Sequence, residues 1–243
     1  MDIRQTAEAN LRSRLVENPY PGRGLVLGLD ESGQRLIQAY WIMGRSENSR
    51  NRVFATDGKR VWTEAADPAK CKDPSLIIYN ALRELTGVYV VTNGDQTDTI
   101  VQTLVAGGTF EQALATRAYE PDAPNYTPRI SGLFDVRLGA PVAKLAVLRR
   151  SAFGDATDRF FWSYEQFAPG LGHCVTTYVG DGSPLPPFEG EPYLLPLTGD
   201  LGCIANTLWT ALDGANKVSL CAKSIDPATL ASEVVVLNKY AKK

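Results

Sequence analysis

The chain has 243 residues, 44% of them apolar, and a formal net charge of −2 at pH 7. Such a chain can bury a sizeable core in one large domain or two small ones. Its near-neutral charge gives no global basic field for nucleic acid, no run is long and apolar enough to cross a membrane, and the polar N-terminus is unlike a secretory signal. We therefore expect a cytoplasmic protein that binds neither nucleic acid nor membranes.

The first part of the chain predicts a helix followed by strands. Apolar residues recur at every fourth position from Ile3 to Leu15, which indicates an amphipathic helix. The Pro-containing segment at residues 18–22 ends this helix. Apolar runs at residues 23–30 and 35–43 predict a hairpin. Further strands are expected at residues 53–56, 60–64, 75–83 and 88–92.

Two adjacent helices interrupt the strands near the middle of the chain. The first is predicted from Asp95 to Gly107, and the second at residues 110–118 behind Thr109 as N-cap. A Pro-rich loop follows at residues 120–129. Later strands are expected at residues 129–136, 144–150, 160–167, 173–179, 217–222 and 233–238. Further helices are expected at residues 204–212 and 227–232, and a lid-like Gly/Pro loop at residues 181–192.

The order of these elements indicates the fold class. The helices are grouped and do not alternate strictly with strands, which disfavours a doubly wound parallel sheet and favours antiparallel sheets covered by helices. No linker is long or polar enough to force a domain boundary within the main body. We therefore predict a single domain over residues 23–243, with residues 1–22 as an N-terminal helical extension.

The thiols and the single histidine limit the chemistry. The four cysteines, the last being Cys221, are scattered without C-x-x-C spacing, so neither a zinc or redox site nor a disulfide framework is expected. His173 is the only histidine, so a Ser-His-Asp triad or a His-rich metal site would depend on it. We expect no metal and no cofactor, and chemistry carried by Tyr, Glu, Asp, Arg, Lys or a thiol.

An arginine-rich loop follows the second strand. Arg45, Arg50 and Arg52 fall within eight residues after Gly44 and are interleaved with serines and asparagines. Guanidinium forks beside hydroxyl and amide groups match the geometry of phosphate oxygens. A solvated surface loop is the alternative.

Three other segments carry candidate groups at the ends of predicted elements. Tyr79 ends an apolar segment, where its hydroxyl can donate to a developing oxyanion; an ordinary strand tyrosine with one wet end is the alternative. Residues 92–97 join a strand to a helix whose free N–H groups can face an anion, or form a plain capped turn. Glu120 and Asp122, in the loop before Arg129, are candidate proton acceptors, or parts of a polar connector.

Taken together, these segments resemble the family of IMP cyclohydrolases first known from archaea, with bacterial relatives. The resemblance covers residues 22–130 well and can be followed loosely afterwards. The segments that carry it are Gly22-Arg23-Gly24-Leu25 to Gly28, Ala39-Tyr40, Arg45-Ser46, Asn51-Arg52, Tyr79-Asn80-Ala-Leu-Arg83, Thr92-Asn-Gly-Asp-Gln-Thr-Asp98 and Asn125-Tyr-Thr-Pro-Arg-Ile130. The chain departs from the pattern in Trp41, in a longer arginine loop and in the extra Tyr126.

The resemblance implies a fold and an activity. The fold is α+β, a four-layer αββα sandwich of two antiparallel sheets flanked by helices, like that of N-terminal-nucleophile hydrolases, although the family uses no freed N-terminal nucleophile. The activity is ring closure of the formamido-imidazole-carboxamide ribotide (FAICAR) to IMP with loss of water, the last step of de novo purine biosynthesis, without metal or cofactor. The partner is this small nucleotide, and a homo-oligomer is compatible with the family.

The resemblance also implies roles for single residues. Tyr79 would donate to the formyl oxygen, Glu120 would accept the carboxamide proton, and Arg45 would stabilise the oxyanion or contact the 5′-phosphate. The further phosphate candidates are Arg23, Arg50 and Arg52. The candidates for orienting ribose and carboxamide are Asn80, Thr92, Asn93, Asp95 and Arg129.

Two alternatives remain open from the residues. The chain could be an amide hydrolase on the same fold acting on another nucleotide or small amide, and Cys174 would then be the only candidate nucleophile. It could also be a non-catalytic purine-nucleotide-binding protein, which would bind IMP without turnover.

Overall fold

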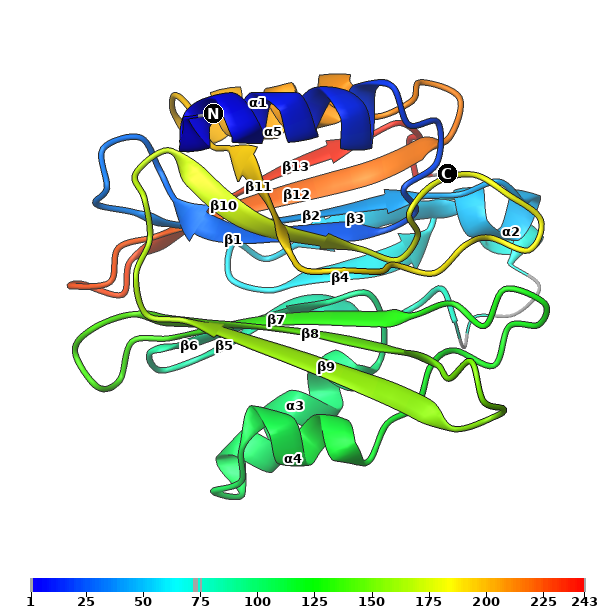
Figure 1. The fold of residues 1–243 in the computed structure, drawn as a ribbon, viewed down its shortest axis with the longest axis horizontal. Coiled ribbons are helices and arrows are strands. Elements are labelled where there is room, and N and C mark those ends of the chain that lie inside the picture. The colour runs from blue at the N-terminus through cyan, green and yellow to red at the C-terminus, as the bar shows by residue number, and fades with distance from the viewer. Residues whose placement is uncertain (1, 72–73, 75, 243) are drawn as a thin grey trace.

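Two antiparallel sheets pack face to face, and helices cover both outer faces (Figure 1). The computed structural model describes residues 2–71, 74 and 76–242. From edge to edge, the six-stranded sheet runs through β11 (Tyr193–Pro196), β10 (Leu171–Thr176), β1 (Gly24–Leu29), β2 (Leu36–Met43), β12 (Lys217–Ile225) and β13 (Ser232–Asn238). The seven-stranded sheet runs through β3 (Arg52–Thr56), β4 (Val61–Ala65), β5 (Asn80–Leu85), β6 (Val88–Thr92), β7 (Arg129–Asp135), β8 (Val142–Arg150) and β9 (Thr157–Tyr164).

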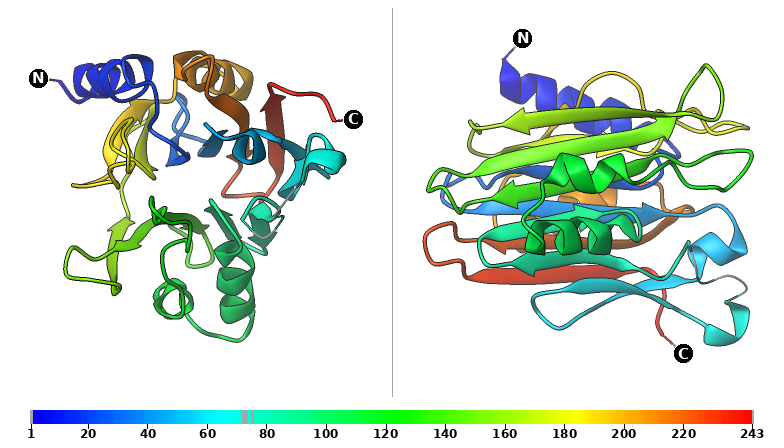
Figure 2. Two further views of the ribbon diagram at one scale, coloured as in Figure 1. Left: turned by 90° about the vertical axis from the view of Figure 1, so that its right-hand side faces the viewer. Right: turned by 90° about the horizontal axis from the view of Figure 1, so that it is seen from below.

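The helices form the two outer layers. α1 (Ile3–Asn10) continues into a π-helical turn at Leu11–Val16 and lies with α5 (Leu201–Ala211) over the six-stranded sheet. α3 (Gln96–Val105) and α4 (Phe110–Ala115) lie across the seven-stranded sheet, as the view from below in Figure 2 shows. The predicted four-layer arrangement of two antiparallel sheets between helices is therefore confirmed.

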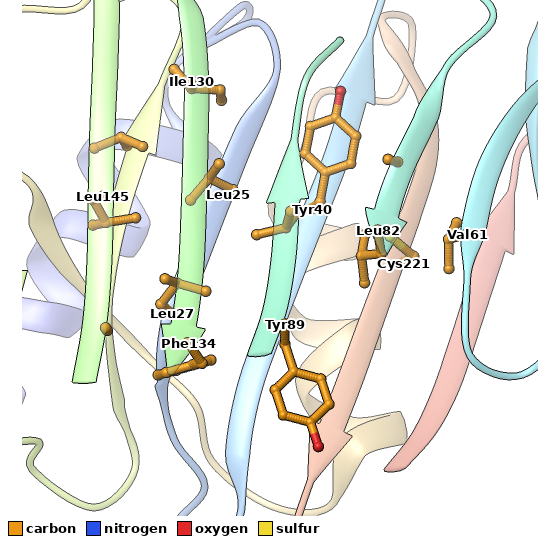
Figure 3. Close-up of a cluster of buried hydrophobic side chains, with 14 of the residues drawn as sticks. Leu25, Leu27, Tyr40, Val61, Leu82, Tyr89, Ile130, Phe134, Leu145 and Cys221 are labelled. Carbon is orange, nitrogen blue, oxygen red and sulfur yellow. The ribbon is translucent and has the colours of Figure 1, made fainter. Parts of the chain in front are cut away.

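The alternation of side chains along the strands explains why this sandwich forms. In β1, Leu25 and Leu27 belong to the cluster between the sheets, whereas Val26 belongs to the cluster under the helices. Successive side chains of a strand point to opposite faces, and a sheet covered on both faces needs apolar residues at both. Figure 3 shows Leu25 and Leu27 lying near Ile130 and Phe134 of the facing sheet.

Two predicted elements are wrong. The strand expected at residues 75–83 begins only at Asn80, because the Pro74 carbonyl accepts the N–H groups of Ile77 and Ile78 and makes a turn there; residue 75 itself lies outside the described residues. The helix expected at residues 227–232 is the turn of the β12–β13 hairpin. It is closed by the Asp226 carboxylate, which accepts backbone N–H groups from the turn.

Three short elements were not predicted, one of them a 3-10 turn at Pro68–Lys70. β11 is a four-residue strand that pairs only with β10, and so short a run carries little periodicity. α2 (Glu47–Arg50) is a single helical turn inside the arginine loop, with Ser46 as its N-cap. The Ser46 hydroxyl accepts the N–H of Ser49 at 3.1 Å. The serines of this loop therefore fix its backbone.

A stacked pair of rings joins β9 of one sheet to β10 of the other. His173 of β10 and Tyr164 of β9 stack with centroids 3.7 Å apart, and the His173 Nδ1 has no hydrogen-bond partner among the described residues. Burial lowers the pKa of His173 to about 4. The imidazole is therefore neutral in the folded protein at neutral pH.

This histidine predicts a loss of stability in mild acid. The unfolded chain binds a proton on His173 near its ordinary pKa of about 6.5, whereas the folded protein resists it down to about 4. The unfolded state therefore binds more protons between these values, and the free energy of unfolding falls as pH falls through this window. In His173→Phe, which keeps a ring on Tyr164, urea denaturation between pH 6.5 and 5 should show a shallower decline. An unchanged slope would contradict this.

Candidate active site

A cavity of about 310 Å³ opens at the end of the sandwich where α2 lies, on the right in Figure 1. It lies between the segment before β1, the arginine loop after β2, the loop before β7 and the loop after β10. We call it the loop cavity. Four of the residues proposed from the sequence line it, namely Arg23, Arg45, Arg52 and Glu120. Its size is in the usual range for small-molecule sites.

A buried ion pair forms one wall of the loop cavity. Arg23 Nη2 donates to Glu120 Oε2 at 2.9 Å, and the two side chains are 10% and 4% exposed. Burial raises the pKa of Glu120, although the charge of Arg23 opposes this. Burial alone would lower the pKa of Arg23, but the Glu120 charge raises it well above its usual range. Glu120 Oε1 has no partner among the described residues, so this oxygen is available to accept a proton.

The backbone before β1 places Arg23 in this wall. Gly22 has a φ of +73°, and a Cβ there would lie 2.2 Å from the Thr177 hydroxyl oxygen. The Gly22 carbonyl accepts the indole N–H of Trp41 at 3.1 Å. Trp41 therefore lies on the helix-covered face of the sheet and supports this turn from behind, so the first departure from the family pattern does not alter the cavity lining.

Arg52 is a buried cation that lines the loop cavity. The residue is 3% exposed, and its Nε donates to the Ser49 carbonyl at 2.8 Å. No Asp or Glu within the described parts of the chain forms an ion pair with it. An uncompensated buried charge is strongly unfavourable. Because the Arg52 side chain lines the loop cavity, an anion, or an oxygen that becomes negative, is the natural partner of this guanidinium.

Tyr79 lies beneath the loop cavity and does not line it. Its hydroxyl shares a 2.6 Å hydrogen bond with the hydroxyl of Tyr40. Burial raises the pKa of Tyr79, while the charges of Arg52 and Arg23 oppose this, so the phenol faces the same two guanidinium groups that line the cavity. It stays protonated at neutral pH and remains a donor.

Arg45 lies at the mouth of the loop cavity. Its side chain is 37% exposed and forms an ion pair with Asp181 in the loop after β10, while also donating to the Gly182 carbonyl at 3.0 Å. The guanidinium lies 5.0 Å from the ring centroid of Tyr20. This position suits contact with a charged group near solvent.

Two of the proposed residues face elsewhere. Arg50 donates to the Gly44 carbonyl and to Asn216, on the far side of the arginine loop. Asn80 donates to Asp98 of α3 on the outer face of the seven-stranded sheet. The structure therefore separates these two from Arg23, Arg52 and Glu120.

The remaining four proposed residues form a network behind the Arg23–Glu120 wall. Asn93 accepts the N–H of Ile130, and its carbonyl accepts from Arg23 Nη1 at 3.4 Å. Arg129 pairs with Asp95 at 2.7 Å, and the Thr92 hydroxyl bonds within the turn to Gly94. These residues do not line the loop cavity. Their contacts hold in place the segment before β1, which carries Arg23, and the segment before β7, which carries Glu120.

Sequence reasoning missed part of the lining. Asp122 was noted as a proton acceptor without a role, and Thr127 only as part of a motif, whereas Tyr20 and Tyr178 were not proposed at all. Tyr178 reaches the cavity because β10 pairs with β1, which brings the end of β10 beside Arg23. No local pattern in the sequence reports this long-range pairing.

The third departure from the family pattern, the extra Tyr126, also lies outside the cavity lining. Tyr126 has a φ of +46° and packs edge-on against Tyr119, with the Arg150 guanidinium 4.2 Å from its ring centroid. Its neighbour Asn125 still lines the loop cavity and accepts the Leu185 N–H at 3.1 Å. The extra residue is thus accommodated as a bulge outside the cavity.

The described residues do not favour a reactive thiol, a metal site or a membrane-spanning helix. Cys174 is fully buried under the helices, away from the loop cavity, and burial raises its pKa to about 12, so it is not a reactive thiol. Within residues 2–71, 74 and 76–242, no group of three or more His, Cys, Asp or Glu is placed to hold a metal ion. In the same part of the chain, no helix is long and apolar enough to span a membrane.

Comparisons with known proteins agree with this site. The family model described as "IMP cyclohydrolase-like protein" matches residues 20–229. The chain is 32% identical over 142 residues to an IMP cyclohydrolase of Methanocella arvoryzae, a match that covers 57% of this chain and 67% of that protein. It is 33% identical over 120 residues to an IMP cyclohydrolase of Methanopyrus kandleri, covering 48% of this chain and 59% of that one. The chain therefore belongs to the family of IMP cyclohydrolase-like proteins.

Proposed function

We propose that this protein is an IMP cyclohydrolase that closes FAICAR to IMP, with loss of water, in the loop cavity. Family membership and the names of the two matched relatives support the reaction. The observation that carries the assignment to this cavity is that its lining combines the buried Arg52, which pairs with no acid among the described residues, and Glu120, whose Oε1 has no partner among those residues. The size of the cavity suits a free mononucleotide. We place the enzyme in the cytoplasm.

The chemistry needs positioning more than a reactive group. The carboxamide nitrogen of FAICAR attacks the formyl carbon of the same molecule, so the reactants are already joined. Holding them in a near-attack geometry can lower the barrier by several kcal/mol (about 7–11 at most). The narrow cavity between the Arg23–Glu120 wall and the arginine loop would select that rotamer.

Charge develops on the formyl oxygen during the attack. Arg52 is preorganised to stabilise it, because its Nε is already bonded to the Ser49 carbonyl and its charge pairs with no acid in the described part of the chain. Tyr79 does not line the cavity in this structure, but it can accept from Tyr40 and would donate its own proton toward that oxygen. Glu120 Oε1 would take the proton that the carboxamide nitrogen loses. Arg45 would contact the 5′-phosphate at the mouth.

Turnover of the purified protein tests the proposal. FAICAR is supplied in the presence of a chelator, and IMP formation is followed by absorbance. We expect IMP to form at a rate unaffected by the chelator. Tight IMP binding without turnover would contradict the proposal and favour a non-catalytic nucleotide-binding protein.

Removing the Tyr79 hydroxyl tests its donor role. In Tyr79→Phe, kcat should fall by about 10²-fold, the lower end for loss of one oxyanion donor, with little change in KM. Tyr40→Phe removes only the group behind the donor and should have a smaller effect. Near-normal turnover in Tyr79→Phe, with an unchanged urea midpoint, would remove the phenol from the mechanism.

A further inference from the structure

A hydrogen-bonded chain of three side chains lines the loop cavity beside Glu120, whose backbone N–H donates to the Thr127 carbonyl, and has no role in the steps above. Tyr178 Oη lies 2.5 Å from Thr127 Oγ1, and Thr127 Oγ1 bonds to Asp122 Oδ2. The Thr127 backbone N–H also donates to Asp122 Oδ1 at 2.6 Å. Thr127 and Tyr178 are 1% and 4% exposed, whereas Asp122 is partly exposed.

The direction of these hydrogen bonds follows from the groups involved. An ionised carboxylate can only accept, so the single hydroxyl proton of Thr127 is donated to Asp122. Thr127 must then accept from Tyr178, which leaves the Tyr178 oxygen as an acceptor without another partner among the described residues. Burial raises the pKa of Tyr178, so the phenol holds its proton at rest. These three side chains thus present the Tyr178 oxygen to the cavity as an acceptor and the Asp122 carboxylate to solvent.

Ring closure needs such a second acceptor. Forming IMP from FAICAR removes one proton from the carboxamide nitrogen and one from the formamido nitrogen, and the former formyl oxygen leaves with two protons as water. Glu120 Oε1 accounts for the first proton. Its side chain is 4% exposed and tied to Arg23, so it is poorly placed to serve both nitrogens and to exchange with solvent.

We propose, resting on the ring-closure function above, that Asp122, Thr127 and Tyr178 relay the second proton from the formamido nitrogen to solvent. The N–H bond breaks, and its electron pair becomes part of the new C=N bond as the C–O bond breaks. The proton moves to Tyr178, that of Tyr178 moves to Thr127, and that of Thr127 moves to Asp122. The departing hydroxide takes the proton that Glu120 had received and leaves as water.

The proton count closes over the whole cycle. Tyr79 protonates the formyl oxygen when the ring forms, and Asp122 is protonated when water leaves. Asp122 then releases one proton to bulk water, and Tyr79 regains one. In this cycle Tyr178 is the catalytic residue, because it contacts the reacting nitrogen, and Thr127 and Asp122 act through it.

Three substitutions interrupt the relay at separate points. Tyr178→Phe keeps the ring stacked on Tyr20 and removes the hydroxyl. Thr127→Val keeps the shape and removes the link, and Asp122→Asn keeps an acceptor for Thr127 but cannot take up the proton. Each should lower kcat by about 10²-fold, as expected for loss of one acid–base component, with KM nearly unchanged. Because they act in series, double variants should be no slower than single ones.

A structural role for the same contacts would give different results. Thr127→Ser retains the hydroxyl and should restore most of kcat. The proton inventory in H2O/D2O mixtures should be bowed in the wild type, because several protons move together, and closer to linear in Thr127→Val. Tyr119→Phe is the matched control, since that hydroxyl bonds to the Asp155 carbonyl outside the cavity, and it should leave kcat unchanged.

The outcomes separate the relay from the function on which it rests. Wild-type protein that forms no IMP would overturn the proposed function. Wild-type turnover combined with normal kcat in Tyr178→Phe, or with additive losses in the double variants, would overturn the relay alone.

Discussion

Glu120→Gln is expected to lower kcat by about 10²–10⁴-fold, the usual contribution of a positioned general base. Glutamine fills the same space and can still accept the Arg23 hydrogen bond, but it cannot take up the carboxamide proton. Steady-state kinetics with FAICAR would measure the loss. Binding of IMP, measured by calorimetry, should be retained.

The same change tests stability, because it removes one member of a buried ion pair. Breaking such a pair typically lowers the free energy of unfolding by about 3–5 kcal/mol, and the retained hydrogen bond should keep the loss at the lower end. Glu111→Gln is the matched control, since Glu111 pairs with Lys144 on the outer face of the molecule. A Glu120→Gln protein that folds and turns over normally would exclude Glu120 as the base.

Arg52→Met should lower kcat/KM by about 10²–10³-fold, which is typical for loss of one preorganised electrostatic donor. Methionine fills most of the volume and carries no charge. Arg52 has no acidic partner among the described residues, so its removal leaves no buried carboxylate without a counterion. The urea midpoint should therefore change little or even rise. This combination of lost activity and retained stability is the signature of a cation held for a ligand.

Arg50→Met provides the comparison within the same loop. The Arg50 guanidinium contacts Gly44 and Asn216 and does not reach the loop cavity. We expect little change in kcat/KM, and a small loss of loop stability through the missing contacts to Gly44. If Arg50→Met lost activity and Arg52→Met did not, the placement of the anion-binding group would be wrong.

Local patterns in the sequence predicted most of the fold. The apolar runs of β1 and β2 and the capping residue of α4 depend on neighbours in the chain, so they could be predicted directly. The failures occurred where a local contact overrode the apolar pattern. Pro74 turns the chain before β5, and Asp226 closes a hairpin where a helix was expected.

The candidate site was only partly predictable, for a related reason. The arginine-rich loop marked Arg52, the resemblance to the family implied roles for Arg52 and Glu120, and the structure brings both to one cavity. Which arginine of the loop faces that cavity depends on the single turn of α2, which directs Arg50 and Arg52 to different sides. Tyr178 joins the site only through pairing of strands far apart in the chain, and sequence spacing carries no signal of that.

A crystal structure of the protein with IMP bound would test the central claim most directly. We predict the nucleotide in the loop cavity, with its phosphate on Arg45, its base beside Glu120 and the Tyr178 hydroxyl, and the Arg52 guanidinium directed at the carbon that carried the formyl oxygen. IMP bound elsewhere on the molecule, with the loop cavity filled only by water, would contradict the account.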